Sequence, residues 1–153
     1  MKPAIIRLDL QNPLFYIPDS ALKPFDLKTL GTEPSASEPF NKEMLFCFEI
    51  EKAASLEFEP KREFFPGTLL ACGQAMNGNP ADSPEKPIVE LPKARYYFAQ
   101  VRELLDKEAI IDLIMEVQQE ALWQRAIPEN RLYLRYLYED NSFVTQVFRP
   151  YKE

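Results

Sequence analysis

The hydrophobic pattern changes period twice within residues 91–151, and this change constrains the fold more than any other feature of the chain. Residues 95–101 (RYYFAQV) have the aromatic content of a strand. Residues 106–125 repeat apolar side chains at three- and four-residue steps, which predicts an amphipathic helix with Asp106 as its N-cap. Residues 131–139 and 143–149 return to strand-like patterns. We therefore expect an α+β fold, with one main helix packed on one face of a twisted antiparallel sheet.

The last two strands are expected to form a hairpin around Asp140-Asn141-Ser142, because all three residue types tolerate tight turns. A loop at Asn141-Ser142 would place Arg135 opposite Phe148. One face of the hairpin, which we assign to the helix, then carries Leu132, Leu134, Tyr136, Tyr138, Thr145 and Val147. The other face is mixed and carries Tyr133, Arg135, Leu137, Gln146 and Phe148. A slip of one residue would exchange the partners on one strand, so the alternative register stays open.

The first part of the chain predicts short strands and two loops, all within a single domain of residues 1–153. Alternating or short apolar runs mark the strand candidates 4–10, 14–17, 44–51, 56–59 and 64–72. Residues 18–42 contain four prolines and predict a long loop. Residues 73–87 are rich in glycine and proline and predict a loop at an internal boundary. Whether this part forms a second strand–helix–strand–strand unit stays open, because its pattern predicts no long helix.

The chain of 153 residues contains no histidine, which excludes several kinds of site. A Ser-His-Asp triad, a Cys-His pair or a zinc site with histidine ligands cannot be built. The four glycines form no recognised phosphate-binding pattern, and no cluster has metal-ligand spacing. We expect no metal and no cofactor. The net charge of −6 and the absence of a basic run argue against a nucleic-acid partner.

The two cysteines lie in apolar surroundings, Phe46-Cys47-Phe48 and Ala71-Cys72-Gly73, and we predict two buried thiols. Arg7 and Asp9 interrupt the apolar start of the chain, so we expect no secretory signal. No apolar run approaches the roughly 20 residues that a membrane span needs. The expected location is therefore cytoplasmic, without a membrane partner.

Aromatic side chains are concentrated in the last third of the chain and allow two interpretations. A sheet under a helix needs large side chains for its core. Alternatively, the sheet is cupped and its mixed face receives a ligand, because pockets are mostly apolar with a few placed polar groups. The candidate ligand-binding residues are Tyr97, Trp123, Tyr133, Arg135, Gln146 and Phe148.

The run Leu91-Pro92-Lys93-Ala94-Arg95-Tyr96, a helix containing Trp123, and an ending at Phe148-Arg149-Pro150 together resemble the second half of GyrI-like small-molecule-binding domains. The resemblance covers residues 90–151. It implies strand–helix–strand–strand units around a cleft for hydrophobic or cationic ligands, as in sensor domains and some hydrolases of electrophilic small molecules. Where that family has an acidic residue before a tyrosine, this chain has Arg135, so the acidic position is not carried over.

Three functions follow from these observations. The first is a non-catalytic binding module, resembling GyrI-like domains, for a small apolar or amphipathic ligand or for a protein partner. The second is an interaction or scaffold protein that forms a homodimer through the same surface or a sheet edge. The third is a small carboxylate-dependent hydrolase, for which Glu49 and Glu90 are the residues to test.

Overall fold

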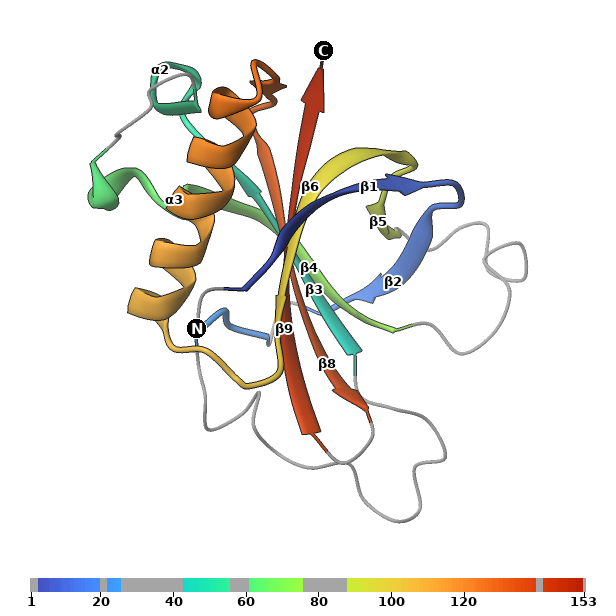
Figure 1. Ribbon diagram of the computed structural model, residues 1–153. Coiled ribbons are helices and arrows are strands. Elements are labelled where there is room, and N and C mark those ends of the chain that lie inside the picture. The colour runs from blue at the N-terminus through green and yellow to red at the C-terminus, as the bar shows by residue number, and fades with distance from the viewer. Residues whose placement is uncertain are drawn as a thin grey trace, which may run out of the picture.

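The computed structural model describes residues 3–19, 22–25, 43–55, 61–75, 88–139 and 142–152. The fold is α+β, with a mostly antiparallel sheet and one main helix (Figure 1). The strands within these ranges are β1 (Ile5–Leu10), β2 (Leu14–Pro18), β3 (Glu43–Glu49), β4 (Thr68–Ala75), β5 (Val89–Leu91), β6 (Ala94–Val101), β7 (Ile127–Pro128), β8 (Arg131–Glu139) and β9 (Ser142–Lys152). The helices are α2 (Lys52–Ser55), the 3-10 turn η1 (Arg62–Phe64) and the main helix α3 (Lys107–Trp123).

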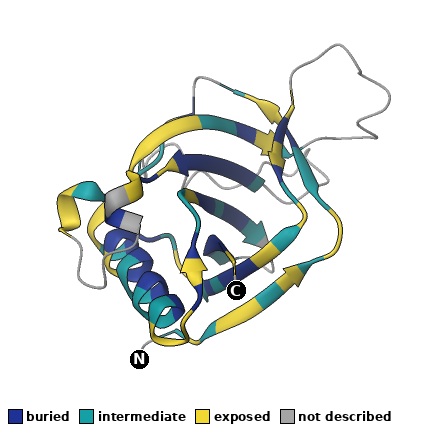
Figure 2. Ribbon diagram, turned by 90° about the horizontal axis from the view of Figure 1, so that it is seen from above, coloured by how far each residue is buried: buried dark blue, intermediate teal, exposed yellow. Residues whose placement is uncertain are grey.

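The strand pairing curls the sheet into a barrel-like ring. The strands follow the order β1-β6-β9-β8-β3-β4-β2-β5, and β7 pairs with β9 beside this path. The strands at the two ends of this order are β1 and β5. They lie near each other because β1 is followed along the chain by β2, which pairs with β5, and β5 is followed by β6, which pairs with β1. β1 pairs with β6, while β2 pairs with both β4 and β5. The curl is visible when the molecule is viewed from above (Figure 2).

Alternation along the strands separates two hydrophobic clusters on the two faces of the sheet. The neighbours Tyr96 and Tyr97 illustrate the separation, since both are fully buried but belong to different clusters. The inner cluster, inside the ring, consists of Tyr16, Leu45, Cys47, Val89, Leu91, Tyr96, Tyr133 and Phe148. The helix-side cluster joins Ile110, Leu113, Ile114 and Val117 of α3 to the sheet residues Met44, Phe46, Phe48, Tyr97, Leu132, Leu134, Tyr136 and Val147.

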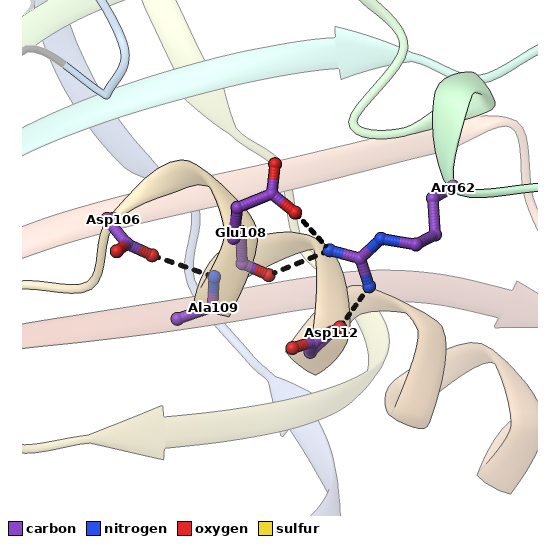
Figure 3. Close-up of polar contacts among 5 residues, drawn as sticks. All are labelled: Arg62, Asp106, Glu108, Ala109 and Asp112. Atoms are coloured by element: carbon purple, nitrogen blue, oxygen red, sulfur yellow. Dashed lines mark hydrogen bonds and ion pairs between the residues drawn. The ribbon is translucent and has the colours of Figure 1, made fainter.

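The first turn of α3 is held by a cap and by an arginine from another element (Figure 3). The Asp106 carboxylate accepts a hydrogen bond from the backbone N–H of Ala109 at 2.9 Å, as expected of an N-cap. Arg62 of η1 donates to the Glu108 carboxylate at 2.6 Å and to the Glu108 carbonyl oxygen at 3.3 Å, and also pairs with Asp112. These contacts with Asp112 and Glu108 raise the pKa of Arg62. η1 is thereby tied to the start of the helix.

The hairpin register differs from the prediction by two residues. Glu139 pairs with Ser142, and Arg135 pairs with Gln146 instead of Phe148. Because side chains alternate with a period of two, this even shift leaves every residue on its predicted face. The last strand is also longer than predicted, since it continues through Pro150 to Lys152.

The fourth strand begins later than predicted because of the residues before it. The chain forms η1 at Arg62–Phe64 and reaches Thr68 through a cis bond at Phe65-Pro66. Gly67 has φ of 101°, and a Cβ there would lie 2.3 Å from the Glu49 carbonyl oxygen, so this position requires glycine. β4 then continues through Gly73 to Ala75, which shortens the predicted loop 73–87.

The predicted loop 18–42 begins later than expected, since Pro18 still belongs to β2. Residues 20–21 and 26–42 of this loop lie outside the described residues, as do the strand candidate 56–59 and residues 76–87. In the described part of residues 1–90, α2 is the α-helix, and it is four residues long.

We expect the Asp106→Ala variant to lower the free energy of unfolding by about 1 kcal/mol, because the first turn of α3 loses its side-chain acceptor. Urea denaturation followed by circular dichroism measures the change. Asp106→Asn is the control and should retain most of the stability. An alanine variant as stable as the wild type would contradict a capping role.

The buried tyrosines predict a loss of stability at alkaline pH. Burial raises the pKa values of Tyr96 and Tyr136, and raises that of Tyr133 to about 12. An unfolded tyrosine releases its proton near pH 10, whereas these remain protonated in the fold. The unfolded state therefore binds fewer protons, and the free energy of unfolding falls as the pH rises from about 10 to 12.

Urea denaturation at several pH values, together with tyrosinate absorbance, tests this expectation. The Tyr133→Phe variant removes one of the delayed protons and should show a shallower decline than the wild type. An identical decline in both proteins would contradict the assignment to Tyr133.

Candidate functional site

Four of the six predicted ligand-binding residues lie together on the inner face of the sheet. Tyr133 pairs with Phe148, and Arg135 pairs with Gln146, across the β8–β9 ladder. Tyr97 lies on the opposite face in the helix-side cluster. The side chain of Trp123, at the last residue of α3, is 76% exposed. The structure thus places Tyr97 and Trp123 apart from the other four residues.

The aromatic members of this inner group are packed side chains. Tyr133 and Phe148 are both buried, and each has an edge contact with Tyr96, at centroid distances of 6.1 and 5.6 Å. Such contacts fill the interior of a small barrel with side chains. Tyr133 and Phe148 therefore contribute to the core inside the ring.

The polar members belong to a hydrogen-bonded chain across the inner face, which we call the polar belt and which consists of Tyr16, Glu43, Gln100, Arg135 and Gln146. Arg135 forms an ion pair with Glu43 and donates to the Gln146 side-chain oxygen at 3.1 Å. The Gln146 amide donates to Gln100 at 2.7 Å, and the Tyr16 hydroxyl donates to Glu43 at 3.2 Å. The belt connects β2, β3, β6, β8 and β9.

The electrostatics of the belt are those of a compensated, mostly buried charge pair. The side chains of Arg135 and Glu43 are 18% and 24% exposed. Burial raises the pKa of Tyr16 although the positive charge of Arg135 opposes this effect, so Tyr16 remains a hydrogen-bond donor at neutral pH. The Nε atom of Arg135 is buried and has no acceptor within the described ranges. The belt thus connects the strands through side-chain hydrogen bonds, and the Nε–H of Arg135 is its one donor without an acceptor among the described residues.

A pocket of about 490 Å³ opens where β2 ends, between β4 and β5, and we call it the seam pocket. β2 pairs with β4 on one side and with β5 on the other, but only as far as Pro18. The β4 residues of the pocket lie beyond that point, whereas on the β5 side its lining consists of Ile88 and Val89, and Val89 pairs with Tyr16 within β2. Its walls are mainly apolar and consist of Pro18, Asp19, Leu22, Leu69, Leu70, Ala71, Cys72, Ile88 and Val89.

The polar groups of the seam pocket favour binding over covalent chemistry. The Cys72 thiol donates to the Asp19 carbonyl oxygen at 3.2 Å, and the Gln74 amide donates to the Asp19 carboxylate at 2.6 Å. Burial, together with the nearby Asp19 charge, raises the pKa of Cys72. A thiol that stays protonated is a weak nucleophile. The pocket therefore offers an apolar surface with one carboxylate at its border.

Both thiols are free, as predicted, but Cys72 is half-buried beside the pocket and only Cys47 is fully buried. Burial is the main cause of the raised pKa of Cys47. The prediction of two buried thiols is therefore wrong for Cys72, because this residue lines the seam pocket.

Sequence reasoning missed the seam pocket and three belt residues, Tyr16, Glu43 and Gln100. The apolar pairs Leu69-Leu70 and Ile88-Val89 were visible signals, since adjacent apolar residues cannot all point to one face of a strand. These pairs indicate a pocket only once it is known that β2 pairs with both β4 and β5, which lie far from β2 in the sequence. Local pattern carries no information about that pairing.

The carboxylates considered for hydrolysis are dispersed. Glu49 pairs with Arg131 at 3.6 Å, with both side chains about half exposed. Glu90 lies on β5, where it pairs with Phe15 of β2. Among the residues that are described, no three acidic or cysteine side chains gather into a metal-binding group. None of the described helices is long and apolar enough to span a membrane.

Comparison with known proteins adds no family to these observations. The chain matches no protein-family model, and a search of curated proteins finds no significant match.

The Glu43–Arg135 pair predicts a measurable coupling energy in a double-mutant cycle. Removing either charge with Glu43→Gln or Arg135→Met leaves the other mostly buried and uncompensated. We expect a coupling of about 2 kcal/mol in the free energy of unfolding, measured by urea denaturation.

The exposed pair Glu49–Arg131 is the matched control on the neighbouring strands β3 and β8. Solvent screens it, so its coupling should stay below about 1 kcal/mol. Equal coupling energies for the two pairs would show that burial of the belt has no energetic consequence.

Proposed function

We propose that this chain is a non-catalytic binding module for a small apolar or amphipathic ligand, or for an apolar segment of a protein partner, and that the ligand occupies the seam pocket. The observation that carries the proposal is the pocket itself, about 490 Å³ with apolar walls. Small-molecule sites typically enclose about 300–1,000 Å³ and combine such walls with a few polar groups. The GyrI-like resemblance of residues 90–151 points to the same class of function.

The rim of the seam pocket supports an apolar ligand. Three of its large apolar lining side chains are more than one-third exposed, namely Leu69, Leu70 and Ile88, and so is Ile17, the neighbour of the lining residue Pro18. They come from β2, β4 and the position just before β5, and these three strands lie in the spatial order β4-β2-β5. A grouped apolar surface of this kind on a protein marks a binding site more often than isolated exposed residues do.

The chemistry of the walls supports binding without catalysis. The thiol of Cys72 has a raised pKa and is engaged with a backbone oxygen. The chain has no histidine to activate it. Asp19 would interact with the polar end of an amphipathic ligand, while the leucine and isoleucine side chains would contact its apolar part.

We expect Nile red, a neutral apolar dye, to bind the wild-type protein with increased fluorescence, and Leu70→Asp to weaken this binding about tenfold or more, equivalent to at least about 1.4 kcal/mol. The control is Ile6→Asp on β1. Leu70 and Ile6 are 44% and 49% exposed, and both lie on strands. The control adds the same charge away from the pocket and should bind dye as the wild type does.

Absence of dye binding to the wild type, or an equal effect of both variants, would contradict the proposed site. Native mass spectrometry of the freshly purified protein complements the test. A retained small-molecule mass that is lost in Leu70→Asp supports the proposal, whereas a dimer that dissociates in the same variant assigns the rim to contact between two copies.

A further inference from the structure

Within the described part of the chain, β1 forms one edge of the sheet. It pairs with β6 over the whole of Ile5–Leu10, and no other described strand pairs with it. Figure 1 draws β1 in front of β6, with no labelled element in front of it. In an antiparallel pair, alternate residues direct their backbone N–H and C=O groups away from the partner strand. The side of β1 opposite β6 therefore presents backbone groups that no described strand pairs.

This edge lacks several features that block pairing at the edges of natural sheets. Proline, lysine and β-bulges are common at such edges. The sequence of β1 is IIRLDL, which contains neither proline nor lysine, and its register with β6 has no shift. Ile6 is apolar and 49% exposed. The two charges of the strand, at Arg7 and Asp9, have opposite signs, so they can complement each other between two copies.

Symmetry limits the registers in which β1 can pair with a second copy of itself. A two-fold axis perpendicular to the sheet makes the two strands antiparallel and keeps each face of the sheet on the same side. Residues that lie opposite each other then share a face, so the axis passes between two copies of the same residue. The registers centred on Arg7 and on Leu8 overlap the largest parts of β1, namely Ile5–Asp9 and Ile6–Leu10.

Charge selects the register centred on Leu8. The register centred on Arg7 would place the two Arg7 side chains directly opposite each other, which is destabilising. The register centred on Leu8 instead places Arg7 of each copy opposite Asp9 of the other. On the other face of the strand it places Leu8 opposite Leu8 and Ile6 opposite Leu10. Opposite charges thus meet on one face and apolar side chains on the other.

The contacts of Arg7 and Asp9 within one copy are compatible with this arrangement. The Nε–H of Arg7 donates to Gln124 at 3.0 Å, and the guanidinium lies 5.7 Å from the centre of the Tyr97 ring. A guanidinium has five N–H groups, so this bond leaves its charge in place. Asp9 is exposed, and its carboxylate has no hydrogen bond or ion pair among the described residues. In the dimer, Asp9 would lie between Arg95 of its own β6 and Arg7 of the second copy.

We propose that two copies of this chain form a two-fold symmetric dimer by antiparallel pairing of their β1 edges, centred on Leu8. Backbone hydrogen bonds join the two sheets, and the pairs of Arg7 with Asp9 fix the register. None of the residues that line the seam pocket comes from β1, so the dimer goes beyond the proposed ligand binding.

Sedimentation velocity over a concentration series of the full-length protein measures this association. We expect a wild-type dimer, and we expect Asp9→Lys and Arg7→Glu each to weaken it about tenfold or more, because like charges then face each other. Glu51→Lys is the control, since it makes the same charge change at an exposed position outside β1, and it should dimerise as the wild type does.

An equimolar mixture of Asp9→Lys and Arg7→Glu tests the pairing itself. In a mixed dimer, Arg7 of one variant faces Asp9 of the other, and the introduced lysine faces the introduced glutamate. The mixture should therefore dimerise although neither variant does so alone. Circular dichroism of each variant establishes that both are folded.

Cysteine cross-linking tests the register. In the register centred on Leu8, the two Leu8 Cα atoms lie about 4.5–5.5 Å apart, which is within the range of a disulfide. Leu8→Cys should therefore form a covalent dimer on oxidation with copper phenanthroline, detected on a non-reducing gel. Ile6→Cys is the control, because its two copies lie roughly 13 Å apart along the strands. The wild type gives the background from Cys47 and Cys72.

Several outcomes would overturn pairing at β1. A wild-type protein that stays monomeric at every concentration overturns it, as does a mixture of the two folded charge variants that fails to dimerise. Cross-linking of Ile6→Cys as efficient as that of Leu8→Cys overturns the register. A dimer that survives Asp9→Lys but dissociates in Leu70→Asp assigns the contact to the rim of the seam pocket instead.

Discussion

The buried guanidinium of Arg149 connects the elements on the helix side of the sheet. It is 1% exposed and donates to the Glu129 carbonyl oxygen at 2.8 Å and to the Gln118 side chain at 2.9 Å. The Gln118 amide in turn donates to the Ala54 carbonyl oxygen at 3.0 Å. Burial lowers the pKa of Arg149 to about 10, and its Nη2 atom has no acceptor among the described residues. One charged group thus joins β9, α3, α2 and the turn before β8, so their positions depend on its hydrogen bonds.

The two faces of the sheet are stabilised in different ways, and the candidate site follows from the difference. α3 covers the outer face through the helix-side cluster, together with Arg149. The inner face is closed by the sheet itself, because β2 and β5 complete the ring and the polar belt crosses it. Among the described residues, β2 ends at Pro18, and the residues of β4 that follow its last pair, Leu69 to Cys72, line the seam pocket. The pocket therefore lies beside the end of β2.

The last third of the fold was predictable from local pattern, and the reasons are specific. The spacing of Ile110, Leu113, Ile114 and Val117 is helical, and these residues are buried in the structure. The two hairpin faces were predicted correctly although the register was wrong by two residues, because an even shift preserves the alternation. The start of β4 was not predictable in the same way, since it depends on the close approach of Gly67 to the backbone of Glu49.

By itself, the sequence determined the α+β class, the main helix with its cap at Asp106, the alternation of the last two strands, and the exclusion of histidine-based chemistry. These features depend on residues near one another in the chain or on composition alone. Only the tertiary structure decided that the sheet curls into a ring, that Glu43 meets Arg135, and that a pocket lies at the end of β2. Those features arise from pairing between strands far apart in sequence, and hydrophobic period specifies which side of a strand is buried but not which strand lies beside it.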